Sequence, residues 1–381
     1  MASTHKRYQR SLAVLAIVGA FALAACGSSG GGGKAQLGSK EFPTSQFPKS
    51  AFGGLSGSAV LYDTSGGSVT QGRNATINKR FTQATGVKFS SDFNNGTAKF
   101  FAAAQAGQVS WSVVELNSKA QLLEATKKGY LAKIDPSVVP VDKLEDGTYT
   151  DYGIPEQLYG TVLVYNTKKW PDSGKHPETL EDLFDTKDFP GPRCLPKDPN
   201  IGAPGVFEGA LLASGVPKDQ LYPFDLDRAF KELDTIKSDT VWWLDGDSAI
   251  RNLTTGECDM GLAWSARAYA AISGGASLKA VWKNTVISNA YYAVPKDAPN
   301  LKAGMAFLAM QLDDTKGQVE LVNRVPYPMP IKSIPVSAYS EKVQPFLPVG
   351  KNYSEAIQLN GDYYAEHLPE LEKAFSDWLV K

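Results

Sequence analysis

The sequence has few of the residues that build reactive centres. Only three cysteines and three histidines occur among 381 residues. His5 lies in the first segment, and neither His176 nor His367 has a second histidine or a cysteine at metal-ligand spacing. Serine-nucleophile, zincin, Cys-x-x-Cys and phosphate-loop motifs are missing as well. The sequence therefore favours a binding protein over an enzyme, and it predicts no catalytic residues, no metal and no cofactor.

An excess of charge of one sign is also lacking. The 39 Lys and Arg nearly balance the 40 Asp and Glu, for a net charge of −1, so no nucleic-acid partner is expected. After residue 25, no apolar run reaches the ~20 residues that cross a bilayer. A hydrophobic content of 43% is typical of a globular chain, here with one large or two ordinary domains.

The N-terminal segment has the layout of a secretory signal peptide. Lys6, Arg7 and Arg10 precede an apolar run from Leu12, and Leu23-Ala24-Ala25-Cys26 resembles a bacterial lipobox. Residues 1–25 are assigned to the signal peptide, and Cys26 is expected to carry a palmitate-type lipid. An ordinary signal peptide with an incidental cysteine is the alternative.

A flexible tether is expected next. Residues 26–56 begin with an almost pure Gly and Ser stretch, which behaves as a coil. The folded part is therefore expected outside the cytoplasm, anchored to the membrane by lipid. In that oxidising location Cys194 and Cys258 form an even pair, and a disulfide and two buried thiols are both compatible with the sequence.

Strands and helices alternate along the rest of the chain. The expected strands are 58–62, 87–91, 112–116, 152–166, 258–264 and 290–294, and the expected helices are 68–85, 97–107, 118–128, 225–236, 247–255, 265–272, 299–312 and a closing pair over 360–381. Gly86 and Gly256 are expected to end helices, whereas Asn117 or Ser118 and Ser265 are expected to begin them. This alternation is typical of an open α/β sheet.

Ligands of such sheets bind at the carboxyl ends of the strands. The turn after the first strand offers the polar groups of Asp63 and Ser65 and the backbone of Gly66. Glu115 and Asn117 lie at the end of the third strand and face one side. Simple capping by Asn117 or Ser118 is an equally good explanation of that stretch.

Trp264 and Arg267 form the sharpest candidate. A tryptophan at a strand end can provide an apolar or cation-binding wall. Arg267 falls in a first helical turn, where the helix dipole prefers acids, so we expect it to grip an anion or carboxylate. A surface arginine paired with a nearby acid is the alternative.

Two adjacent tyrosines, Tyr291 and Tyr292, raise the possibility of a ferric-iron site. Neighbouring side chains on a strand face opposite ways, so one tyrosine is expected in the core and the other in the cleft. Tyr292 is assigned to the ligand site, together with Glu156 and Asn289. Iron binding remains an alternative function.

Ordered motifs extend over nearly all of the mature chain. They are Gly86-Val87, 129–135, Tyr152-Gly-Ile-Pro155, 164–166, Phe189-Pro-Gly191, Gly256-Glu-Cys-Asp-Met-Gly-Leu-Ala-Trp264 with Arg267, 293–295 and Val325-Pro-Tyr-Pro-Met329. In order and spacing the chain resembles the extracellular solute-binding proteins of ABC importers, in particular the spermidine/putrescine-binding group. The resemblance implies a two-lobed, periplasmic-binding-protein-like (type II) α/β fold with a hinge and a central ligand cleft.

Within that resemblance Trp264 falls on the tryptophan that stacks on the polyamine, and Ser65 and Ser118 fall on cleft positions. The group's acids do not carry over, because Pro204 and Gly205 stand near one such position and Asn289 near the other. Burying two ammonium groups without paired carboxylates is costly. The absence of these acids, together with the presence of Arg267, favours an amino acid-like or γ-amino acid-like solute over a plain polyamine.

The resemblance also implies a domain division and partners. Lobe 1 is expected to hold residues 57–162 and 286–340, lobe 2 residues 163–285, and residues 341–381 a helical segment that packs on the lobes. Cys194 and Cys258 then share lobe 2, where neighbouring strands favour a disulfide between them. We expect a monomer that delivers its solute to an ABC permease. A surface scaffold or adhesin, and a hydrolase using Asp63 or Glu115, are the alternatives.

Overall fold

The computed structural model describes residues 35–37, 40–42, 54–197 and 204–381. Strands β1 (Ala35–Leu37) and β2 (Lys40–Phe42) pair in antiparallel fashion. The predicted signal peptide, the lipidation site Cys26 and most of the tether lie outside the described residues. None of the helices in the described part is long and apolar enough to cross a membrane.

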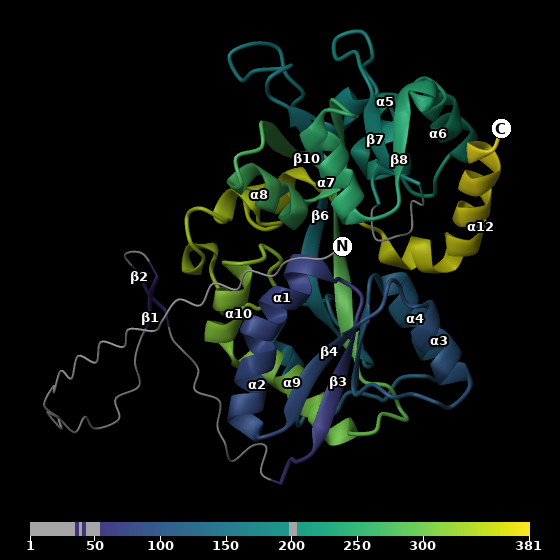
Figure 1. The fold of residues 1–381 in the computed structure, drawn as a ribbon. Helices are drawn as coiled ribbons and strands as arrows, with labels where there is room; N and C mark the ends of the chain where they lie inside the picture. Colours follow the sequence, from purple (N-terminus) through teal and green to yellow (C-terminus); the bar gives the residue numbers. More distant parts are fainter. Residues whose placement is uncertain (1–34, 38–39, 43–53, 198–203) are drawn as a thin grey trace, which may run out of the picture. The chain divides into compact units, whose positions relative to one another are not determined.

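Nine strands of the described residues form one sheet, in the order β4-β3-β5-β10-β6-β9-β7-β8 with β11 beside β10. Their bounds are β3 Ser58–Asp63, β4 Lys88–Phe93, β5 Val113–Leu116, β6 Gly153–Asn166, β7 Arg193–Pro196, β8 Thr240–Trp243, β9 Met260–Trp264, β10 Leu278–Ala293 and β11 Ile357–Gln358. Strand β3 runs parallel to β4 and β5, and β7 runs parallel to β8 and β9. The long strands β6 and β10 pair antiparallel between these two groups (Figure 1).

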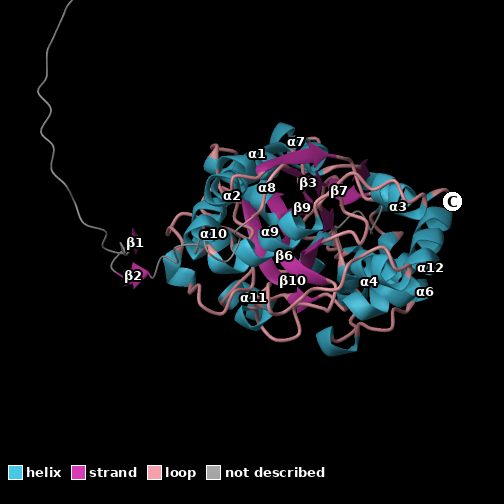
Figure 2. Ribbon diagram, turned by 90° about the horizontal axis from the view of Figure 1, so that it is seen from below, coloured by secondary structure: helices cyan, strands magenta, loops and turns pink. Residues whose placement is uncertain are grey.

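Helices surround these strands (Figure 2). They are α1 Gly67–Ala75, α2 Ile77–Thr85, α3 Ala98–Gln105, α4 Lys119–Lys127, α5 Val206–Ala213, α6 Leu226–Leu233, α7 Gly246–Thr255, α8 Ser265–Ser273, α9 Leu301–Asp313, α10 Thr315–Val322, α11 Lys351–Glu355 and α12 Gly361–Leu379. Gly86 and Gly256 end α2 and α7 in the left-handed conformation, as predicted. The predicted α/β class is confirmed.

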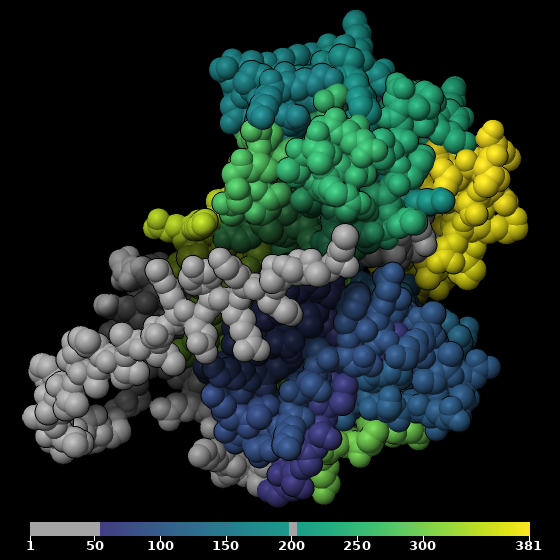
Figure 3. Space-filling model, viewed as in Figure 1, coloured from purple at the N-terminus to yellow at the C-terminus, as the bar shows by residue number. Residues whose placement is uncertain are grey.

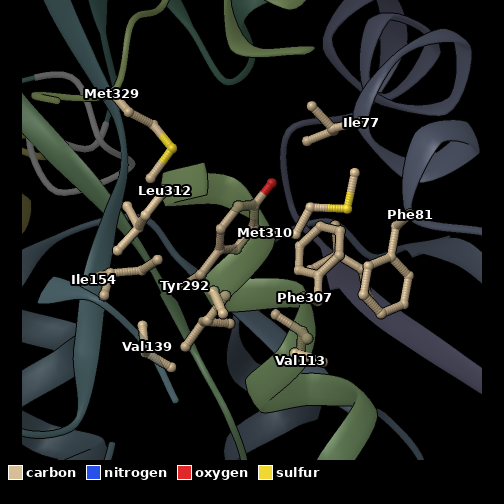
Figure 4. Close-up of a cluster of buried hydrophobic side chains, with 14 of the residues drawn as sticks. Ile77, Phe81, Val113, Val139, Ile154, Tyr292, Phe307, Met310, Leu312 and Met329 are labelled. Carbon is tan, nitrogen blue, oxygen red and sulfur yellow. The ribbon is translucent and has the colours of Figure 1, made fainter. Parts of the chain in front are cut away.

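Each parallel group of strands has a core of its own. Beside β3–β5, Phe307 of α9 packs against Phe81 at 5.4 Å and Tyr292 at 5.6 Å between ring centroids (Figure 4). Beside β7–β9, Phe207 of α5 packs against Phe375 of α12 at 5.8 Å. Two cores on either side of a shared strand pair are the arrangement expected of a two-lobed fold.

Some sequence expectations about the elements were wrong. The helix expected over 68–85 breaks at Thr76, whose φ and ψ of −119° and −97° separate α1 from α2. The closing helical pair is the single helix α12, which contains Pro369. Ser265 is the first residue of α8 rather than its cap, and its hydroxyl instead accepts a hydrogen bond from the Gly160 N–H at 3.3 Å.

The sequence also missed β7, β8 and the part of β10 before residue 290. Strand β10 is buried along most of its length, so its residues show no clean alternation of apolar and polar side chains. A strand covered on both faces carries little of the period-two signal on which sequence assignment depends.

Candidate ligand-binding site

A cavity of about 400 Å³ opens at the carboxyl ends of the parallel strands. Its walls are the segments that follow β3 (64–67), β4 (93–96), β8 (244–247) and β9 (264–267), with Asn117 after β5. Gln157 and Tyr159 of β6, Ala290 of β10 and Tyr327 complete the lining. In the space-filling view, the green surface that includes α7 and α8 lies above and the blue surface of the early strands and helices lies below (Figure 3). This is the place that the strand topology predicts for a ligand.

Buried carboxylates hold the loop after β3 in place. The Asp63 carboxylate accepts hydrogen bonds from the Ser65 and Gly66 N–H groups at 3.0 and 3.3 Å. The Glu115 carboxylate accepts from the Thr64 N–H at 2.8 Å and from the Ser65 hydroxyl at 2.5 Å. The loop therefore presents its backbone to the cavity in one defined conformation.

Both carboxylates belong to a buried cluster centred on Arg73. The Arg73 Nη1 lies 3.2 Å from Asp63 Oδ1 and 2.8 Å from Glu115 Oε2. Its Nη2 lies 2.5 Å from Oε1 of Glu156, the extra residue at a register shift between β6 and β10. Arg73 and Asp63 are fully buried.

The charges of this cluster shift one another's pKa. Burial by itself lowers the pKa of Arg73, but Glu115 and Glu156 raise it well above its ordinary value. Burial also tends to raise the pKa of Asp63, yet Arg73 and the Thr70 hydroxyl hold it below its ordinary value. For Glu156 burial prevails over Arg73 and raises the pKa to about 8.

The structure thus places Asp63, Glu115 and Glu156 behind the cavity wall, where they bind Arg73, rather than among the lining residues. The direct ligand contact expected of them stays a prediction, but in the structure these side chains contact Arg73 and do not line the cavity. Arg73 was missed in the sequence, where an arginine inside a helix gives no sign of the three acids around it.

Tyr292 belongs to the core rather than to the cleft. Its ring packs on Phe307 (Figure 4) and lies 5.7 Å from the Arg73 guanidinium carbon. Its buried hydroxyl has no hydrogen-bond partner within the described residues. Tyr291 is also buried and packs with a different hydrophobic cluster, so the two tyrosines face opposite ways but neither lines this cavity. In the part of the chain that the structure describes, no group of three or more His, Cys, Asp and Glu side chains is placed to hold a metal ion.

Two other expected contacts also lie elsewhere. The Ser118 side chain caps α4 by accepting a hydrogen bond from the Gln121 N–H at 3.3 Å. Asn289 is turned away from the cavity, since it lines a second cavity of about 700 Å³ together with Leu158 and Tyr291. The predicted residues that do line the 400 Å³ cavity are Ser65, Gly66, Asn117, Trp264 and Arg267.

The opposite wall carries a pair of opposite charges. The Arg267 Nη1 lies 2.5 Å from Oδ1 of Asp247, and its Nη2 reaches the Ser65 carbonyl oxygen at 3.5 Å. Trp264 lies against the first turn of α7, where a Cβ on Gly246 would be only 2.5 Å from the indole ring. Asp247 was missed because an acid in a first helical turn is ordinary for the helix dipole.

Three helices begin at the cavity. The N-caps of α1 and α8 are Gly66 and Trp264, and neither provides a side-chain cap, whereas Asp245 caps α7. Uncapped helix N-termini offer N–H donors and a positive dipole end to an anion. Together with Arg267 they suit a carboxylate, while Asp247 offers one partner for a cation.

A disulfide joins Cys194 of β7 to Cys258, just before β9, with a Cα–Cα distance of 5.6 Å. Both residues are fully buried. The bridge lies within the strand group that carries Trp264 and Arg267, because β7 pairs directly with β9.

The family described as bacterial extracellular solute-binding protein matches residues 76–344. The chain is 29% identical over 303 residues to the gamma-aminobutyric acid (GABA)-binding protein of Pseudomonas aeruginosa, which covers 78% of this chain and 83% of that protein. A GABA receptor of known structure is 32% identical, with a TM-score of 0.76 over 85% of this chain and 98% of that one. AgtB from Agrobacterium tumefaciens R10, solved with agropinic acid, is 26% identical with a TM-score of 0.74 over 85% and 99%.

Proposed function

The chain belongs to the bacterial extracellular solute-binding proteins, and we propose that it captures a small amino acid-type solute with one carboxylate and one ammonium group. It is two-lobed like its solved relatives, and these relatives are named as binding proteins rather than enzymes. A small-molecule solute and an ABC permease are the partners expected of this family.

The pairing of Arg267 with Asp247 carries the proposal. The two charged groups lie 2.5 Å apart and pair with each other. A solute with both charges can pair with both residues at once, so that the guanidinium of Arg267, whose side chain is only 15% exposed, is not left buried and unpaired, which would cost free energy. The uncapped start of α1 adds N–H donors for the carboxylate.

A polyamine fits this lining less well. The acids that the lining offers are Asp247, which already faces Arg267, and Asp245, which caps α7. The three carboxylates behind the wall bind Arg73. Two ammonium groups would therefore share few free acids, whereas Arg267 would be left without a new partner. The names of two relatives, a GABA-binding protein and a GABA receptor, agree with a γ-amino acid-like solute.

We propose that the lobes follow the division expected from the sequence, 57–162 with 286–340 and 163–285, and that β6 and β10 are the hinge. The segment 341–381 contacts both, since Asp362 pairs with Lys119 of α4 and the Tyr364 hydroxyl donates to Glu208 of α5. Closure of the lobes on solute should reduce the radius of gyration in small-angle scattering. An unchanged radius at saturation would indicate a rigid module.

We further propose that Cys26 carries a lipid and tethers the protein to the membrane beside its permease. The support is the lipobox-like stretch and the Gly and Ser composition that follows it. A tethered receptor would keep its solute close to the transporter.

Three four-carbon compounds test the solute class by calorimetry and thermal shift: 4-aminobutyrate, 1,4-diaminobutane and butyrate. They share their chain and differ only in their end groups. Preference for 4-aminobutyrate is expected, and a stronger response to the diamine would favour the polyamine alternative. No response to any of these compounds or to common amino acids would favour a scaffold or adhesin.

A further inference from the structure

Exposed apolar side chains gather at the mouth of the cavity. Among the described residues, seven large hydrophobic side chains are exposed, and two of them, Phe93 at 55% and Leu244 at 63%, line this cavity. A single exposed apolar side chain is ordinary. Two that meet at one cavity from separate strand groups need an explanation, because each leaves apolar area in water.

The two side chains approach from opposite sides. Phe93 is the last residue of β4, and its ring lies over the start of α1, since a Cβ on Gly66 would be 2.5 Å from the ring. Leu244 directly follows β8 and precedes the N-cap Asp245 of α7. Phe93 therefore belongs to the β3–β5 group and Leu244 to the β7–β9 group, and both groups contribute walls of the cavity.

The same walls carry both charged and apolar side chains. Arg267 and Asp247 provide the charges, while Trp264, Phe93 and Leu244 provide apolar area. An α-amino acid has both of its charged groups on one carbon, so no methylene groups lie between them. A longer amino acid separates its charges by methylene groups, and these methylenes need an apolar partner.

We propose that Phe93 and Leu244 determine specificity by burying the methylene chain of the solute, so that the site prefers ω-amino acids over short or α-amino acids. This inference rests on the proposed function. Phe93 and Leu244 come from different strand groups, and closure on the solute removes both side chains and the chain between them from water. Each buried methylene is worth about fourfold in affinity.

The test is calorimetric titration with an ω-amino acid series that runs from glycine through 3-aminopropanoate and 4-aminobutyrate to 5-aminopentanoate. For the wild type we expect affinity to rise by about fourfold per methylene until the cavity is filled, with a negative heat-capacity change. Phe93→Ala and Leu244→Ala should each reduce the slope of this series, which is the gain in affinity per added methylene. The affinity for the shortest amino acid that binds should change least. The slope is informative because a general structural defect would weaken every member alike.

Tyr353→Ala and Leu301→Ala are the matched controls, since these side chains are also exposed, at 43% and 38%, and lie outside this cavity. Both should keep the wild-type slope. An unchanged slope in Phe93→Ala and Leu244→Ala, or a wild type with equal affinity along the series, would overturn this inference and leave the proposed function standing. If the wild type bound no amino acid at all, the proposed function would fall and this inference with it.

Discussion

The guanidinium of Arg267 bridges the two walls of the cavity: it lies 2.5 Å from the carboxylate of Asp247 and 3.5 Å from the carbonyl oxygen of Ser65. Its side chain is only 15% exposed. An arginine in this position is already desolvated and oriented before a solute arrives. Charged contacts of that kind affect binding strongly, whereas exposed charges at a rim contribute little.

Replacing Arg267 with alanine should therefore weaken 4-aminobutyrate binding by about 2 kcal/mol or more. Trp264→Ala should cost a similar ~2 kcal/mol if the ring is a hot spot. Titration calorimetry measures both, and Arg251→Ala, an exposed arginine on α7, is the control. If only Trp264→Ala weakened binding, the solute would be a plain amine and the polyamine alternative would gain.

Arg73→Met should destabilise the protein by about 3–5 kcal/mol, the cost typical of leaving buried charges without their partner. Among the described residues, Arg73 is the cation that pairs with Asp63, Glu115 and Glu156. Urea denaturation of the variant measures the loss, with Arg251→Met as the exposed counterpart. A change below about 1 kcal/mol, as for surface pairs, would show that the cluster contributes little.

The pH dependence of stability should change in Glu156→Gln. The pKa of Glu156 is raised from 4.5 in the unfolded chain to about 8 in the fold, chiefly by burial. The folded state then keeps a proton that the unfolded state has lost, so this residue's contribution to stability falls as pH rises from about 4.5 to 8. The slope for one proton is at most ~1.4 kcal/mol per pH unit.

Glutamine removes that titration and keeps the size of the side chain. The stability of Glu156→Gln relative to wild type should therefore rise between pH 5 and 8, measured by denaturation at several pH values. A constant difference over that range would mean that Glu156 does not hold a proton in the fold.

The bridge between Cys194 and Cys258 should be detected by alkylation and intact-mass measurement. Before reduction, neither of these two thiols should react in denatured protein, and after reduction both should. The double variant Cys194→Ala/Cys258→Ala lacks the bridge, and its free energy of unfolding should be lower by about 2–4 kcal/mol. Labelling of both cysteines without reduction would contradict the disulfide.

Lipid attachment at Cys26 should be lost in Cys26→Ser, because serine has no thiol to carry the lipid. Wild-type protein is expected in the detergent phase of a detergent partition and the variant in the aqueous phase. A variant that partitions like wild type would show that the protein is anchored by something else or not at all.

Several features could be read from the sequence because they depend on neighbouring residues. The alternation of elements predicted an α/β sheet, and Gly86 and Gly256 predicted two helix ends. Trp264 and Arg267 could be singled out because the end of a strand and the first turn of a helix can be recognised from neighbouring residues alone. Both line the cavity in the structure.

Other features depend on segments far apart in the chain. Asp63, Glu115 and Glu156 carry no local mark of their common partner Arg73, which reaches Glu156 from 83 residues away. The residues next to Tyr292 in the sequence do not indicate whether its side chain faces the cleft or the core. It faces the core because its ring packs against Phe307 of α9. Asp247 pairs with Arg267 only because α7 and α8 begin next to each other at the cavity.

The amino-acid sequence by itself determined the class of fold, the edge of the sheet at which the cavity opens and the aromatic and arginine residues of one wall, because local periodicity and strand ends encode these. Tertiary structure alone decided which acids face the cavity and which are buried on Arg73, and it brought Phe93 and Leu244 to one mouth. The reason is physical: whether a carboxylate is available to a ligand depends on the charges that surround it in space, and those charges come from distant parts of the chain.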